Sequence, residues 1–253
     1  MPRHKPGAKR PAAVLACVFW LAVWQIASML VGERLFLPYP GEVLATLWGL
    51  LGDSTFYSTL GFSFARLALG FFAALIMGSL LAYAAYKISF VETLLRPLMA
   101  LAKAAPAATF TMLLLIFFGS RNISAPVVFI MVLPLFYSNL LTGAQSVDPE
   151  LFEAAAVFGM LPTDRFRFIY LPYVTPFFLS SCEVGWGMSW KAGVSAEVIA
   201  ITAGSVGGAI YDAKITLETA DLFAYTLVVI IISLLLEKLT RTLICYIEKL
   251  LTD

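Results

Sequence analysis

Residues 11–32 read PAAVLACVFWLAVWQIASMLVG, a stretch of 22 residues without a charged side chain. At about 1.5 Å of rise per residue, a helix of this length crosses a bilayer core of about 30 Å. Basic residues precede the stretch, as in a signal peptide, but the apolar run is far longer than the roughly 7–15 residues of a cleavable signal. We therefore expect an uncleaved first transmembrane helix.

The composition of the whole chain is that of a membrane protein. Of its 253 residues, 60% are hydrophobic and only 13% are charged, and the mean hydropathy is +0.88. Soluble domains average roughly 45–50% apolar and about 25% charged residues, so the apolar surplus must face lipid. The net charge of +1 gives no electrostatic basis for binding nucleic acid. We expect an all-α fold, a polytopic bundle of membrane helices.

Five further apolar windows are each long enough to hold a membrane span. They cover residues 67–86, 104–120, 122–147, 173–200 and 222–239. We expect the window at 104–120 to extend back toward Pro97. Residues 43–51 are too few to span and predict a short helix at the membrane interface, whereas glycine-containing residues 203–220 predict an outer connection. The sequence thus predicts about six transmembrane helices in a single transmembrane domain, residues 1–253.

The basic residues predict the orientation of this bundle. Six spans place both termini on the same side of the membrane. If that side is the cytoplasm, twelve of the 17 Lys and Arg residues fall in cytoplasmic segments and three in outer ones. Four of the twelve lie in a basic tail at residues 1–10. Such an excess is typical of cytoplasmic segments, so we expect both termini in the cytoplasm.

Residue types that carry catalysis or bind metals are scarce. Cys17, Cys182 and Cys245 lie in apolar stretches without a partner at metal-ligand spacing, and the sole histidine is His4 in the basic tail. Most nucleophile–base mechanisms need a histidine inside the fold. We expect no metal site, no cofactor and no enzymatic activity.

The loop after the fourth window contains a complete helix signal. Residues 148–159 read DPELFEAAAVFG. Asp148 is suited to cap the helix, Pro149 to occupy its first position, and Glu150 to interact with the positive end of its dipole. Gly159 supplies a left-handed stop. The sequence predicts a helix of about 15 Å, and its three alanines suit it to lie in a groove of another protein.

The spacing of residues across this loop resembles a known family. Glu153-Ala154-Ala155 is followed after three residues by Gly159, after nine more by Ile169, and after one more by Leu171-Pro172. This pattern is similar to the signature loop in the permease subunits of binding-protein-dependent ABC importers. The resemblance implies a coupling loop at residues 148–172, between spans four and five, whose helix docks on a cytoplasmic ATPase. It assigns ATPase coupling to Glu153, Ala154, Ala155, Gly159, Leu171 and Pro172.

The resemblance also implies the partners and the location of the chain. The sequence has no Gly-x-x-x-x-Gly-Lys-Ser/Thr loop for nucleotide phosphates, so ATP hydrolysis falls to a separate subunit. Members of the family work in a bacterial plasma (inner) membrane with two ATPase subunits and an extracytoplasmic substrate-binding protein. A second copy of the permease, in a homodimer, is the expected arrangement, although a related chain can take its place.

Shorter motifs resemble one branch of this family, the nitrate, sulfonate and taurine permeases. They are Phe36–Pro40, Arg66 with Gly70-Phe71, Arg96-Pro97, Ala105-Pro106, Phe118-Gly119 and Ser195–Val198. Ala107–Phe110 and Lys191 depart from the usual pattern of the branch, which bears on the substrate. We expect a small, anionic solute, and the sequence leaves a pyrimidine thiamine precursor open as an alternative.

Five residues of the fifth window are candidates for the translocation pathway. They are Glu183, Trp186, Trp190, Lys191 and Glu197. Charges at bilayer depth normally face a cavity or a partner. Lys191 either attracts the anionic solute or pairs with an acid on a neighbouring span, and the tryptophans either stack on the solute or pack between helices. Glu197 lies near the outer end, where we expect snorkelling and a structural or gating role.

Three other function classes make different predictions. An ion-gradient-driven secondary transporter would work without an ATPase and would carry inverted repeats with paired broken helices, which the sequence does not show. A channel would need neither ATP nor a binding protein. A membrane enzyme would need a nucleophile–base pair or a metal site.

Overall fold

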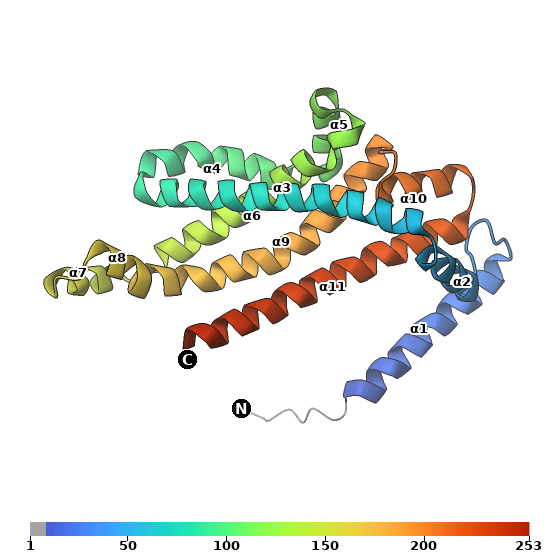
Figure 1. Ribbon diagram of the computed structural model, residues 1–253, viewed down its shortest axis with the longest axis horizontal. Helices are drawn as coiled ribbons and strands as arrows, with labels where there is room; N and C mark the ends of the chain where they lie inside the picture. The colour runs from blue at the N-terminus through green and yellow to red at the C-terminus, as the bar shows by residue number, and fades with distance from the viewer. Residues whose placement is uncertain (1–8, 253) are drawn as a thin grey trace. The chain divides into compact units, whose positions relative to one another are not determined.

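The structure, a computed structural model, describes residues 9–252, with only the backbone for residues 9–13, 152 and 243–252 (Figure 1). Most of the predicted basic tail therefore lies outside the described residues. Within them, every regular element is helical. The elements are α1 (Lys9–Val31), α2 (Pro40–Leu51), α3 (Ser54–Lys87), α4 (Ser89–Ala104), α5 (Ala107–Phe118), η1 (Ser120–Asn122), α6 (Ser124–Gln145), α7 (Pro149–Val157), α8 (Pro162–Arg165), η2 (Phe166–Tyr170), α9 (Leu171–Ala200), α10 (Val206–Ile215) and α11 (Thr219–Thr252).

The described chain forms two compact units. One comprises residues 9–57 and 209–228, and the other comprises residues 58–208 and 229–252. In the first unit, hydrogen bonds fix the turn that follows α1. Ser28 Oγ donates to the carbonyl of Leu37 over 2.6 Å, and Trp24 Nε1 donates to the carbonyl of Pro38 over 3.2 Å. The short helix expected near residues 43–51 is present as α2, which starts earlier because Pro40 suits the first helical position.

The second unit is built on α6, which packs along α9 (Figure 1). Four apolar side chains of α6 are fully buried, those of Val127, Val128, Val132 and Phe136. Glycines on α3 allow close approach to α6, because a Cβ at Gly70 would lie 2.8 Å from Val128 Cβ and one at Gly78 would lie 2.7 Å from Phe136 Cβ. Small residues at such contacts are characteristic of helix packing in membranes.

The helices agree with several predicted spans. Four segments are long and apolar enough to cross a membrane: Val14–Val31, Ser54–Lys87, Ser124–Gln145 and Thr219–Thr242. A fifth arises if α4 and α5 together count as one broken span. Helix α9 has 30 residues, about 45 Å of rise, but it is more polar. The count of six spans and the cytoplasmic termini stay predictions.

The third span expected around residues 104–120 is broken in the structure. Two helices meet there at a bend of 106°, and α5 has only 12 residues. The cause is local, because Ala105 and Pro106 adopt extended backbone angles and proline has no N–H for a helical hydrogen bond.

The predicted start of the second span also differs from the structure. Helix α3 runs on through Arg66, whose guanidinium lies 4.0 Å from the ring centroid of Phe62 and donates to Asn122 Oδ1 over 3.1 Å. The charge of Arg66 therefore does not end the helix. Residues 203–220, expected as an outer connection, contain the short helix α10.

Candidate functional site

The predicted loop helix is present as α7, with the expected ends. Asp148 Oδ1 accepts a hydrogen bond from the backbone N–H of Glu150 over 3.0 Å, and Pro149 is the first helical residue. Gly159 adopts a φ of 64°, where a side chain would be strained. Around this turn, the N–H of Met160 donates to the carbonyl of Ala155 over 2.9 Å. Such a left-handed cap reverses the chain immediately after the helix.

A small apolar cluster holds α7 against the rest of its unit. Ala155 is only 4% exposed and packs with Val147 and Ile169, with Met160 partly buried beside them. Val147 follows α6, and Ile169 lies in the π-helix η2 that leads into α9. The cluster therefore joins α7 to the cytoplasmic ends of α6 and α9, as the topology predicted above places them.

The other described side chains of α7 and its C-terminal end are uncovered. Glu153 and Ala154 are exposed, and Val157 and Phe158 are each 84% exposed. The two neighbouring apolar side chains Val157 and Phe158 form a small exposed apolar patch, the kind of surface at which contacts with other molecules form. Of the remaining predicted coupling residues, Leu171 and Pro172 are also exposed and form the first turn of α9.

The charged residues in the middle of α9 pair with α11. Lys191 Nζ lies 3.7 Å from Glu237 Oε1, and Glu183 Oε1 lies 3.9 Å from Arg241 Nε. The Lys191 side chain remains 69% exposed. Sequence reasoning missed Glu237 and Arg241. Their signal was available: α11 carries an acid followed by a base, the same order along the chain as Glu183 and Lys191, and two such helices can pair their opposite charges when they run antiparallel.

The two tryptophans of α9 pack among aromatic side chains of α3. The Trp186 ring stacks on Phe71 with a centroid distance of 4.1 Å and lies parallel to Phe64 at 6.0 Å. Trp190 is buried and contacts Phe64 at a tilted angle. Both rings thus serve as helix packing, one of the two alternatives that the sequence left open.

Glu197 does not snorkel as expected. It is fully buried, and its carboxylate accepts hydrogen bonds from Ser63 Oγ over 2.8 Å, Ser124 Oγ over 2.9 Å and the N–H of Gly207 over 3.2 Å. Ser63 also accepts a hydrogen bond from the N–H of Val206. These donors come from α3, α6 and α10, so Glu197 joins four helices at the end of α9. No sequence spacing links the serines to Glu197, which explains why this cluster was not predicted.

Comparison with known proteins identifies the family. Residues 70–252 match the family described as the inner membrane component of binding-protein-dependent transport systems. The chain is 30% identical to the taurine transport system permease protein of Escherichia coli, covering 91% of this chain and 84% of that protein. It is 28% identical to the nitrate import permease protein of Synechocystis sp., covering 93% of this chain and 87% of that protein.

The fold is similar to that of a solved transporter. The membrane chain of a bacterial alginate ABC transporter, in complex with an alginate-bound periplasmic protein, matches with a TM-score of 0.64 at 14% identity over 90% of this chain and 91% of that chain. The family match and the two relatives confirm the resemblance to ABC importer permeases and argue against the secondary transporter, channel and enzyme alternatives. This chain belongs to the family of inner membrane components of binding-protein-dependent transport systems, as a multi-pass transport subunit rather than an enzyme.

Proposed function

We propose that this permease carries a small anion, a sulfonate such as taurine or an ion such as nitrate, and that α7 is its contact with a cytoplasmic ATPase. The geometry of α7 is the main support for this proposal. One side of the helix is fixed through Ala155 to the chain next to α6 and α9, and the exposed Val157 and the C-cap residue Phe158 are presented to a partner at its C-terminal end. A movement imposed on the exposed side is therefore transmitted to two membrane helices. The anionic cargo is proposed by similarity to the taurine and nitrate permeases.

In the proposed cycle, two ATPase subunits bind ATP and close, which draws together the α7 helices of two permease copies. The permease dimer then opens outward and receives the solute from the substrate-binding protein. Hydrolysis of ATP and release of the products restore the inward-open state. The chain itself contributes the path and the α7 contact, and it contributes no catalytic group.

The docking role of α7 predicts loss of the ATPase subunit from the Phe158→Glu variant. A charge in the middle of an apolar contact costs several kcal/mol when it is desolvated without a partner, so co-purification of the ATPase with the tagged permease should fall at least about tenfold. Ile215→Glu is the matched control, because Ile215 is also exposed but lies at the end of α10. Equal recovery of the ATPase from both variants, with both permeases folded, would contradict the docking role.

A role for Lys191 in attracting the anion predicts opposite effects at the two partners of its ion pair. Its contact with Glu237 is long and exposed, so the pair itself contributes at most about 1 kcal/mol. Lys191→Gln should raise the KM for uptake of the sulfonate in proteoliposomes several-fold, whereas Glu237→Gln should leave the lysine free and lower the KM. Equal impairment of both variants would instead assign the pair a purely structural role.

A further inference from the structure

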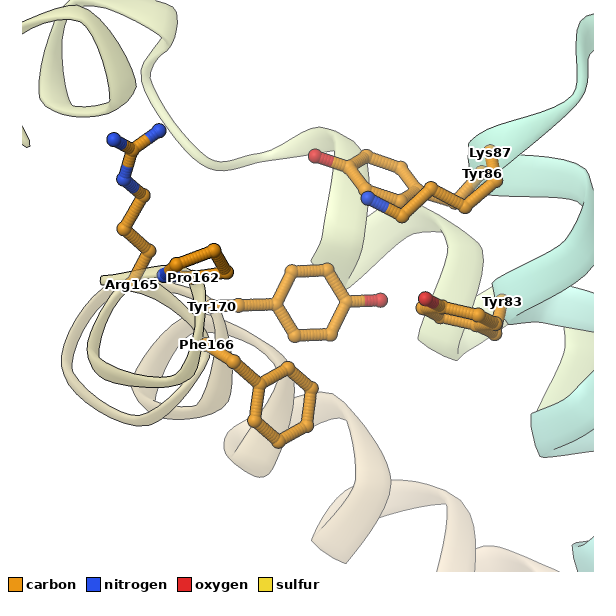
Figure 2. Close-up of a pocket in the computed structure, with 7 residues that line it drawn as sticks. All are labelled: Tyr83, Tyr86, Lys87, Pro162, Arg165, Phe166 and Tyr170. Atoms are coloured by element: carbon orange, nitrogen blue, oxygen red, sulfur yellow. The ribbon is translucent and has the colours of Figure 1, made fainter. Parts of the chain in front are cut away.

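A cavity of about 350 Å³ lies between the end of α3 and the segment after α7 (Figure 2). Its lining residues are Tyr83, Tyr86, Lys87, Pro162, Arg165, Phe166 and Tyr170. None of these is acidic, two are cationic, and three carry phenolic hydroxyls. The predicted topology places this cavity at the cytoplasmic surface of the membrane. Its residues play no part in the α7 contact or in the pairs along α9 described above.

The two cations are available to a ligand. The ion pairs found among the described side chains involve neither Lys87 nor Arg165. The Lys87 ammonium lies 5.6 Å from the centroid of the Tyr86 ring and 5.9 Å from that of Tyr83. Arg165 donates only its Nε–H, to the carbonyl of Met160 over 2.9 Å, which holds the loop and leaves the outer nitrogens of the guanidinium for another acceptor.

Aromatic packing gives the cavity a fixed shape. The rings of Tyr170 and Phe166 stack with a centroid distance of 5.5 Å, and Tyr170 lies 5.5 Å from Tyr86. Figure 2 shows the Tyr170 ring between the Arg165 side and the α3 side of the cavity, with its hydroxyl directed toward Tyr83. The hydroxyls and the two cations form a set of hydrogen-bond donors suited to phosphate oxygens.

A second cavity, of about 340 Å³ and mainly apolar, shares Tyr83, Phe166 and Tyr170 with the first. Its other lining residues are Ser79, Ala82, Leu140, Leu171, Val174, Thr175 and Phe178. These come from α3, α6 and α9, which places the second cavity along the membrane helices. A cationic chamber at the membrane surface thus continues into an apolar one.

We propose that the two cavities together bind one anionic phospholipid, with the phosphate between Lys87 and Arg165 and an acyl chain along Val174 and Phe178. Charge complementarity selects the headgroup, and the apolar continuation distinguishes a lipid from a free phosphate. Basic pockets between membrane helices on the cytoplasmic side suit such headgroups. The site joins the end of α3 to the loop that links α7 to α9, so its occupant would hold these segments together during transport.

Native mass spectrometry of the purified complex tests the proposal with phosphatidylglycerol and phosphatidylcholine as probes. Wild type should retain phosphatidylglycerol in preference. Lys87→Gln should lower its retention about fivefold, and the double variant with Arg165→Gln about twentyfold. Lys87→Gln is less disturbing to the structure than Arg165→Gln, because the Arg165 side chain also donates a hydrogen bond to the carbonyl of Met160 in its own loop. The matched control is Arg96→Gln with Lys103→Gln, two cations that line a different cavity together with Glu92.

Two further arms identify the ligand. Val174→Trp fills the apolar chamber and should reduce lipid retention although both cations remain. Inorganic phosphate in excess should fail to displace the lipid, because it cannot occupy the apolar chamber. The proposal is overturned if the control loses as much lipid as Lys87→Gln, if Val174→Trp has no effect, or if inorganic phosphate competes freely.

Discussion

Replacing Glu197 by leucine is expected to lower the free energy of unfolding of the permease by about 3 kcal/mol or more. The side chain is fully buried and accepts hydrogen bonds from Ser63, Ser124 and the N–H of Gly207. Leucine leaves these donors without an acceptor in a region that water does not reach, and each buried donor so orphaned costs about 1–3 kcal/mol. Thermal unfolding of the purified protein in detergent measures the loss.

Two comparisons make the Glu197 experiment specific. Glu197→Gln keeps a carbonyl acceptor at the same place and should cost only about 1 kcal/mol. Glu183→Gln removes an acid from the same helix, but from an exposed pair with Arg241, and should cost less than about 1 kcal/mol. If leucine at position 197 is tolerated as well as Glu183→Gln, the hydrogen-bond cluster does not hold the four helices together.

Replacing Ala155 by leucine is expected to uncouple ATP hydrolysis from transport. The extra atoms overfill the cluster with Val147 and Ile169, which costs about 1–3 kcal/mol and displaces α7 from its contact with these two residues. The exposed side of α7 is unchanged, so the ATPase subunit should still bind and hydrolyse ATP. The amount of solute taken up per ATP hydrolysed, measured in proteoliposomes, should fall. We expect a loss of about tenfold for each 1.4 kcal/mol by which the contact between α7 and the cluster is weakened.

The neighbouring alanine provides a control for this variant. Ala154 is exposed and lies outside the apolar cluster, so Ala154→Leu should leave the contact of α7 with Val147 and Ile169 intact. Uptake that stays proportional to hydrolysis in Ala155→Leu would show that the cluster does not transmit the movement.

The sequence was most informative where the structure depends on local rules. Asp148, Pro149 and Gly159 each have a backbone role that follows from residue type alone, and all three are used as predicted. The break at Pro106 follows from the same backbone chemistry. The apolar window did not reveal it, because hydropathy gives the length of an apolar stretch but not the direction of the helix axis along it. The family signature in the loop was correct for the same reason as the helix: it is a short-range pattern.

Long-range contacts were beyond the sequence. The partners of Glu197 lie 73 residues away at Ser124 and 134 residues away at Ser63, and a serine in a membrane helix carries no mark of its partner. The end of α9 is a similar case. Ile201 adopts a left-handed backbone with φ 52°, although sequence rules favour glycine there and Gly204 lies only three residues further on. The next residue, Thr202, is buried and donates from its hydroxyl to the carbonyl of Ser120 and from its N–H to the carbonyl of Glu197, and these hydrogen bonds hold the turn.

Site-specific photo-crosslinking from position 158 tests the central claim most directly. A photoreactive amino acid in place of Phe158 lies at the exposed C-terminal end of α7, and one in place of Ile215 at the end of α10 serves as the control. After illumination of membranes that contain the whole transporter, we expect a covalent adduct with the ATPase subunit from position 158 and none from position 215. An ATPase that co-purifies with the permease but never crosslinks to position 158 would contradict the account.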